Sequence, residues 1–242
     1  MNPSPPNPTP FQYGWWSFDL GEYRPCNGTY CFYPYESLPP IPDAQFTGKL
    51  EWLGPLKQDI DALMQAYRNA AGTVKGTKPQ LQKIIASAQE LGLTLPEAYI
   101  RLMASSELQD RIPSCTACEF RIAKEIVPCP TSEDGYLIPF LNDQQDVLLW
   151  YLYLTPKGEA CVLVSPYELE AIKLAEREPE NAEKWRQAIL NNTQVCASSF
   201  EAFVYRFWLE NVLWFNANEG EGSLTEDQQR YLAHYQSEQS NQ

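Results

Sequence analysis

Apolar side chains recur three or four positions apart in the first half of the chain, which is the spacing of amphipathic helices. Residues 55–71 follow this pattern, and Gly72 supplies a C-terminal stop. The stretch TKPQ at 77–80 has the form of a capping box and predicts a second helix. The stretch TLPE at 94–97 repeats that form and predicts a third helix, which continues to residue 108.

The pattern becomes that of β-strands after residue 113. Residues 118–122 alternate apolar and polar side chains, and three apolar runs follow at 136–141, 147–155 and 161–165. The short polar stretches NDQQD and PKGEA separate these three runs, so together they predict an antiparallel meander. The middle run, VLLWYLYLT, is apolar on both faces, which predicts a central strand that is covered on both sides.

Helical spacing returns after the meander. Residues 166–190 predict an acidic surface helix that is interrupted near Pro179. The stretch SSFE at 198–201 has the form of a capping box and opens a helix that is apolar nearly all round, and therefore buried. A short helix fits 224–235. The fold class is therefore predicted to be α+β, with an antiparallel β-meander sheet and helices before and after it.

The N-terminal region differs in composition from the rest of the chain. Residues 1–10 include five prolines and predict a disordered tail. Residues 11–72 are expected to form an irregular aromatic arm and a helix that pack on the core. The α+β domain then covers 73–216, and 217–242 form an acidic polar tail. The arm's rings either pack against the body or form a binding surface, and the most prominent of them are Tyr13, Trp15, Trp16, Tyr30, Phe32 and Tyr33.

Charge narrows the classes of function. The 242 residues carry a net charge of −13, which argues against non-specific binding to nucleic acid. No apolar run approaches the length of about 20 residues that spans a membrane. The N-terminal residues lack the pattern of a signal peptide, so a cytoplasmic location is expected by default.

The seven cysteines are odd in number and irregularly spaced, and most are expected to be free thiols. Cys115 and Cys118 have the spacing of zinc ligands, and Cys129 is a third candidate. Three interpretations are open for the pair: structural cysteines, a zinc site and redox-active thiols. The only histidine, His234, lies in a polar region, which argues against hydrolase chemistry based on a nucleophile and histidine. No phosphate-binding glycine loop is present, and we expect no cofactor.

Three stretches together resemble the SMI1/KNR4-like (SUKH) superfamily. LPEAYIRLM at 95–103 resembles its LP-x-x-Y/F entry helix, and 135–166 resemble its meander. ASSFEAFVYRFW at 197–208 resembles its closing helix, which typically begins S-F-x-x-F/W. The resemblance covers roughly 81–215. The chain departs from the family at 105–118, where members often carry Asn-Gly, and its aromatic N-terminal region lies outside the shared core.

The resemblance implies a non-enzymatic protein-binding module. Bacterial members resemble immunity proteins that neutralise toxins, many of them nucleases, and fungal members act as scaffolds. An acidic surface suits a basic partner of this kind. The alternative is a small zinc- or thiol-dependent protein that uses Cys115 and Cys118.

Candidate contacts with the partner follow from turn position and charge alone. They are Glu133, Asp134, Asp143, Asp146 and Glu159. The NDQQD stretch is open to two interpretations, a solvated hairpin turn or a partner contact. The loop pattern that binds Ca²⁺ is absent from it.

Overall fold

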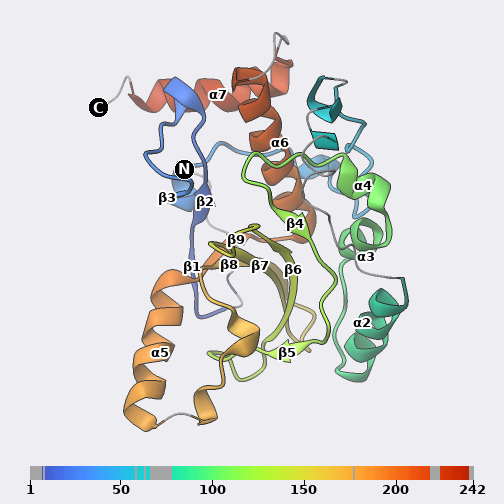
Figure 1. Ribbon diagram of the computed structural model, residues 1–242, viewed down its shortest axis with the longest axis vertical. Coiled ribbons are helices and arrows are strands. Elements are labelled where there is room, and N and C mark those ends of the chain that lie inside the picture. The colour runs from blue at the N-terminus through green and yellow to red at the C-terminus, as the bar shows by residue number, and fades with distance from the viewer. Residues whose placement is uncertain are drawn as a thin grey trace.

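The computed structural model describes residues 7, 9–57, 59–62, 64–65, 78–176, 178–218 and 224–239. Its main element is a seven-stranded sheet in the order β1-β9-β8-β7-β6-β4, in which β5 also pairs with β6 (Figure 1). The strands are β1 (Gln12–Tyr13), β4 (Glu119–Phe120), β5 (Val127–Pro128), β6 (Tyr136–Asn142), β7 (Leu149–Leu154), β8 (Ala160–Ser165) and β9 (Gln194–Ala197).

The predicted meander is confirmed. β6, β7 and β8 pair in antiparallel fashion, and the register of β6 with β7 runs from Tyr136↔Leu154 to Asn142↔Leu149. Every residue of β7 is buried, as the apolar character of both faces of this strand predicted. The only parallel pairing among the described strands joins β1 to β9. The sheet is thus mostly antiparallel and lies among helices, which is an α+β arrangement.

Helices cover both faces of the sheet. One face packs against α5 (Pro179–Asn192) and two short 3₁₀ turns, η4 (Leu169–Ala171) and η5 (Leu174–Glu176). The other face packs against α2 (Lys78–Glu90), α3 (Glu97–Ala104), α4 (Ser106–Asp110) and α6 (Phe200–Asn218). Figure 1 shows α5 on one side of the sheet and α2 and α3 on the other.

The helices before the sheet follow the predicted positions, but their ends differ. The N-cap of α3 is Pro96, with no hydrogen bond from a side chain, so the predicted capping role of Thr94 is wrong. The predicted third helix divides at Ser105, whose side chain accepts a hydrogen bond from the Leu108 amide and so caps α4. Of the helix predicted at 55–71, residues 59–62 and 64–65 are helical, and most of the remainder lies outside the described residues.

The helix predicted for 166–190 begins later than expected. Residues 169–171 and 174–176 form the separate turns η4 and η5, and α5 starts at Pro179. Proline fits the first turn of a helix because its missing N–H is not needed there. Pro179 therefore begins the helix that the pattern suggested it interrupts.

α6 is almost entirely buried, as predicted. Its capping differs from the predicted capping box, because Ser199 rather than Ser198 accepts the Ala202 amide. The side chain of Glu201 instead bonds to the N-terminal arm. Its carboxylate accepts hydrogen bonds from the Leu50 amide (3.1 Å) and from Trp52 Nε1 (2.9 Å).

The N-terminal arm, residues 9–57, packs on this body. It contains a two-stranded sheet of β2 (Trp15–Ser17) and β3 (Cys31–Tyr33). It also contains three 3₁₀ turns: η1 (Gly21–Tyr23), η2 (Tyr35–Ser37) and η3 (Asp43–Gln45). The Phe11 and Trp15 rings are buried, which satisfies the expectation that the arm packs its rings. The tail predicted for 1–10 lies mostly outside the described residues.

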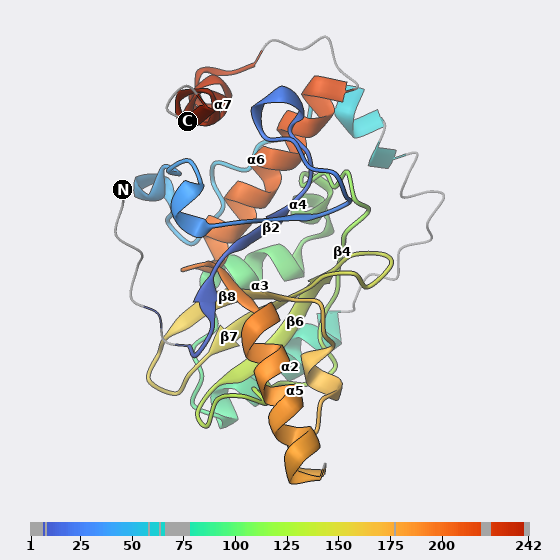
Figure 2. The same cartoon turned by 90° about the vertical axis from the view of Figure 1, so that its left-hand side faces the viewer.

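The C-terminal residues add a further helix, α7 (Glu226–Gln239), which lies within the predicted polar tail. Tyr231, Leu232 and Tyr235 are buried against α6 and the arm, so these residues belong to the packed body. Figures 1 and 2 show α7, α6 and the arm together at one end of the molecule and α5 at the other. Within the described ranges, no helix is both long and apolar enough to cross a membrane.

Candidate functional site

The five predicted contact residues do not form one site. The antiparallel register places residues that precede β6 or follow β7 at one end of the meander, and the β6–β7 turn at the other. Glu133, Asp134 and Glu159 therefore lie at one end, and Asp143 and Asp146 at the other. With about 3.3 Å for each residue of β6, the two groups are roughly 20 Å apart.

Asp143 is buried inside the NDQQD turn. Its side chain accepts hydrogen bonds from the Gln145 amide (2.8 Å) and from the Tyr30 hydroxyl (2.7 Å). Asp143 is only 3% exposed. The turn is thus a hairpin turn as predicted, but Asp143 is neither solvated nor available to a partner, because its carboxylate binds the N-terminal arm.

Asp146 is the exposed carboxylate of the same turn. Its φ of 55° places it in the left-handed region, which aspartate tolerates better than most residues. Its carboxylate accepts a hydrogen bond from Asn142 Nδ2 at 3.2 Å. The exposed Val147 follows it.

The other three candidates lie on the surface. Lys157 donates to Asp134 at 2.8 Å, and this contact holds the pKa of the Asp134 carboxyl below its usual range. Glu159 accepts a hydrogen bond from Thr155 Oγ1 at 2.9 Å. Glu133 is exposed. Asp134 therefore forms an exposed ion pair with Lys157, and Glu133 is a second exposed carboxylate at this end.

Cys26 and Cys31 form a disulfide, which the spacing of the cysteines did not predict. The other five cysteines are free thiols. Burial raises the pKa of Cys115, and burial raises the pKa of Cys118 to about 11, so both are protonated near neutral pH. Among the described residues, no three His, Cys, Asp or Glu side chains are grouped so as to hold a metal ion.

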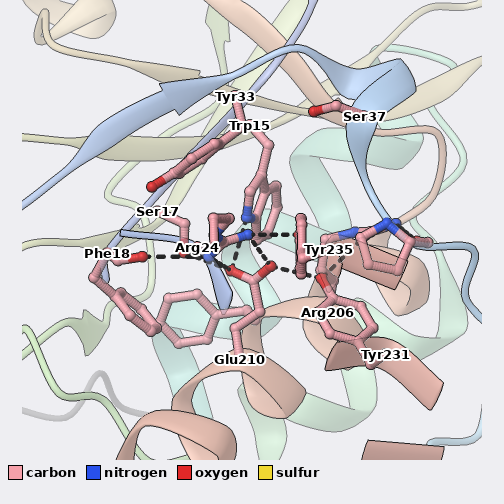
Figure 3. A network of polar contacts seen from close by, with 12 residues as sticks. Trp15, Ser17, Phe18, Arg24, Tyr33, Ser37, Arg206, Glu210, Tyr231 and Tyr235 are labelled. Carbon is pink, nitrogen blue, oxygen red and sulfur yellow. Dashed lines mark hydrogen bonds and ion pairs between the residues drawn. The ribbon is translucent and has the colours of Figure 1, made fainter. Parts of the chain in front are cut away.

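A buried carboxylate, Glu210, joins the two ends of the chain (Figure 3). Arg24 of the arm donates to it with both terminal nitrogens, at 2.7 and 2.8 Å. Trp15 Nε1 donates at 2.9 Å, Ser17 Oγ donates as well, and the Tyr231 hydroxyl of α7 donates at 2.6 Å. Five donors thus surround one carboxylate on α6, and they come from the arm and from α7.

The charge of Glu210 follows from these contacts. Burial alone would raise the pKa of Glu210, but Arg24, Ser17 and Tyr231 lower it to about 2. Burial would lower the pKa of Arg24, and the adjacent carboxylate raises it instead. Both groups stay charged, and the carboxylate accepts hydrogen bonds from five donor atoms. The cluster is a structural clamp.

Arg206 adds a second cation to the clamp. It donates to the Tyr231 hydroxyl at 2.9 Å and to the Pro39 carbonyl at 3.0 Å. The Tyr231 hydroxyl therefore accepts from Arg206 while it donates to Glu210. This chain of bonds fixes the proline-rich part of the arm against α6 and α7.

A pocket of about 250 Å³ lies where these three segments meet. The arm contributes Pro39, Pro40, Ile41 and Pro42, α6 contributes Tyr205 and Leu209, and α7 contributes Asp227, Arg230 and Tyr231. Asp227 and Arg230 pair with each other. Pockets for drug-sized ligands are usually larger, about 300–1,000 Å³. The lining is largely apolar, and the volume lies just below that range.

The surplus of negative charge is the main electrostatic feature of the surface. Nine Lys or Arg side chains of the described residues form ion pairs with acids of the same chain. The chain has 31 acidic and only 18 basic residues. Most of these ion pairs are exposed, so the negative outward field follows from the surplus of acidic residues.

No protein-family model matches the chain, and no curated protein and no solved structure matches it significantly.

Proposed function

We propose that the protein is a non-enzymatic protein-binding module that uses its acidic surface to bind a basic protein. The proposal extends to the role that the resemblance to SMI1/KNR4-like proteins suggests, namely an immunity or scaffold protein. A basic toxin domain such as a nuclease is the partner that we favour, and the proposed location is the cytoplasm.

One observation carries the proposal: the chain has 31 acidic and 18 basic residues, which gives it a net charge of −13. Complementary charge accelerates association and discriminates between partners. In the buried cluster around Glu210, the carboxylate accepts hydrogen bonds from the arm and from α7, which suits a rigid scaffold. Raised thiol pKa values at Cys115 and Cys118 also favour binding over thiol chemistry.

Four of the five predicted contacts are exposed, and we keep them as proposed contacts with the partner. We no longer propose Asp143, because it is buried. Asp146 belongs to the end of the meander nearer the arm, and Glu133, Asp134 and Glu159 to the far end. The two groups can be tested separately, since they lie at opposite ends.

The test is affinity capture from the source cell, with the captured protein identified and quantified. We expect one basic protein in stoichiometric amount, released by raised salt. Asp146→Lys should weaken its capture if the near end makes contact, and Glu133→Lys with Glu159→Lys should do so if the far end does. If nothing binds in stoichiometric amount, or if the captured protein is acidic and insensitive to salt, the proposal is wrong.

A further inference from the structure

Phe32 is an aromatic ring on the surface of the arm. It is 45% exposed, and the other large hydrophobic side chains exposed in the described part of the chain are Val147 and Leu91. The rest of the arm's rings are buried or half-buried. Phe32 is thus the exception to a segment that otherwise packs its aromatic side chains inward.

The Phe32 ring is held in place on one side by the backbone of the arm. A Cβ atom at Gly14 would lie 2.4 Å from Phe32 Cε2, so only glycine allows the ring to rest on the chain there. Trp16 is the register partner of Phe32 in the small sheet, and their ring centroids are 5.7 Å apart in an edge-to-face arrangement. Trp16 is itself fixed, because its Nε1 donates to Gln194 Oε1 at 2.7 Å.

The strand that carries Phe32 is fixed as well. Cys31, the preceding residue, is bonded to Cys26. Tyr30 donates to Asp143 at the β6–β7 turn, and its ring packs against Trp150 at a centroid distance of 6.4 Å. An exposed side chain that is already ordered loses little entropy on binding, which is the property of a preorganised anchor.

Acidic residues outnumber basic ones in the arm. Residues 9–57 contain three basic residues, Arg24, Lys49 and Lys57, and Arg24 is buried and paired with Glu210. The acids of the same span are Asp19, Glu22, Glu36, Asp43 and Glu51, and the last four are exposed. Asp146 adds a further exposed carboxylate at the turn to which Tyr30 is bonded. A cation that approaches Phe32 meets the ring, and the net charge of −13 attracts it to the protein.

We propose that Phe32 anchors the docking surface and that it receives an arginine-bearing basic segment of the protein partner. This inference rests on the proposed function and identifies the surface that binds the partner. Arginine suits the site better than lysine because its planar guanidinium stacks on an aromatic ring while it still pairs with carboxylates. Nucleic acid is disfavoured by the negative field.

The experiment uses the full chain and short synthetic peptides of alternating arginine and glycine, with lysine–glycine and serine–glycine peptides of equal length. Binding is measured by calorimetry at low and at physiological salt. We expect the arginine peptide to bind best and the serine peptide not to bind. Phe32→Ala should lower the affinity for the arginine peptide by about fivefold or more. Phe32→Tyr should keep the affinity, since it keeps the ring.

Leu91→Ala is the matched control, because Leu91 is exposed like Phe32 but directly follows α2. It should leave the affinity unchanged. Phe32→Leu keeps an apolar side chain without the ring and replaces Phe32→Ala as the test variant if Phe32→Ala does not fold. It should also lower the affinity for the arginine peptide.

The outcomes separate the two proposals. If the arginine peptide binds the wild type and both Phe32→Ala and Phe32→Leu alike, the assignment of this surface is wrong and the proposed function stands. If neither the arginine nor the lysine peptide binds the wild type, both are wrong. If Phe32→Ala and Leu91→Ala weaken binding equally, the ring has no special role and the assignment fails.

Discussion

Replacing Glu210 with glutamine tests the clamp between the arm, α6 and α7. The substitution keeps the shape of the side chain and removes its charge. Arg24 would then remain buried beside a neutral amide, and the amide nitrogen would replace one of the two acceptor oxygens. A buried charge without its counter-ion destabilises the folded state strongly.

The magnitude follows from the structure in two independent ways. The pKa of Glu210 falls from the ordinary value of 4.5 to about 2 in the folded protein. One pKa unit corresponds to about 1.4 kcal/mol, so the ionised carboxylate stabilises the fold by about 3 kcal/mol. Breaking a buried ion pair by removing one partner costs about 3–5 kcal/mol. A loss of about 3–5 kcal/mol, at about 2–4 °C per kcal/mol, predicts a fall in Tm of about 6–20 °C.

The assay is thermal unfolding, with Glu97→Gln as the matched control. Glu97 pairs with Arg101 at 2.6 Å, but both side chains are about half exposed. Such a pair contributes about 0.3–0.5 kcal/mol, so the control should lower Tm by no more than about 2 °C.

The dependence on pH gives a second measurement. Because the folded pKa of Glu210 is lowered, its contribution is complete above the unfolded value of 4.5 and is lost as the pH falls to about 2. The stability gap between wild type and Glu210→Gln should therefore narrow across this window. If Glu210→Gln costs no more than Glu97→Gln, or if the gap stays constant down to pH 2, the charge of Glu210 does not stabilise the fold.

Three further changes test other contacts. Tyr30→Phe removes the hydroxyl that donates to the buried Asp143 and should lower the free energy of unfolding by about 1–3 kcal/mol, measured with urea. An unchanged urea midpoint would mean that water replaces the Tyr30 hydroxyl. Reducing the Cys26–Cys31 disulfide should lower the free energy of unfolding by about 2 kcal/mol, because the loop that it closes is short. A dithiol should therefore lower the Tm of the wild type and leave the Tm of the double serine variant unchanged. Cys118, whose pKa is raised to about 11, should react with iodoacetamide far more slowly in the native protein than in urea, and purified protein should contain no stoichiometric zinc. Fast native alkylation or bound zinc would favour the thiol or zinc alternative.

The meander and the main helices were predictable because their signals are local. Alternation of side chains, two short polar turns and the doubly apolar run at 147–155 suffice to place β6, β7 and β8. The buried α6 was predictable from its all-round apolar surface.

The clamp was not predictable as a pair, since Arg24 and Glu210 are 186 positions apart. One signal was present nevertheless. Arg206 and Glu210 stand within a mostly apolar helix, and buried charges require partners. That pattern indicates that polar groups from elsewhere must reach α6, but it cannot say that they come from the arm and α7.

The burial of Asp143 was not predictable for a related reason. Position in a turn indicates exposure, yet Asp143 is covered by Tyr30, a residue 113 positions earlier. The disulfide was also missed, because neither the odd number of cysteines nor their spacing distinguishes a bonded pair from free thiols.

The pairing of Arg24 with Glu210 has a consequence for synthesis of the protein on the ribosome. At about 5–20 residues per second, the chain between them takes roughly 10–40 s to emerge. During that time the arm has made neither its parallel pairing with β9 nor its contact with α6. Trp15 and the arm's other buried rings are then without their final cover, so a chaperone that shields nascent apolar segments should bind this N-terminal region first and release it last.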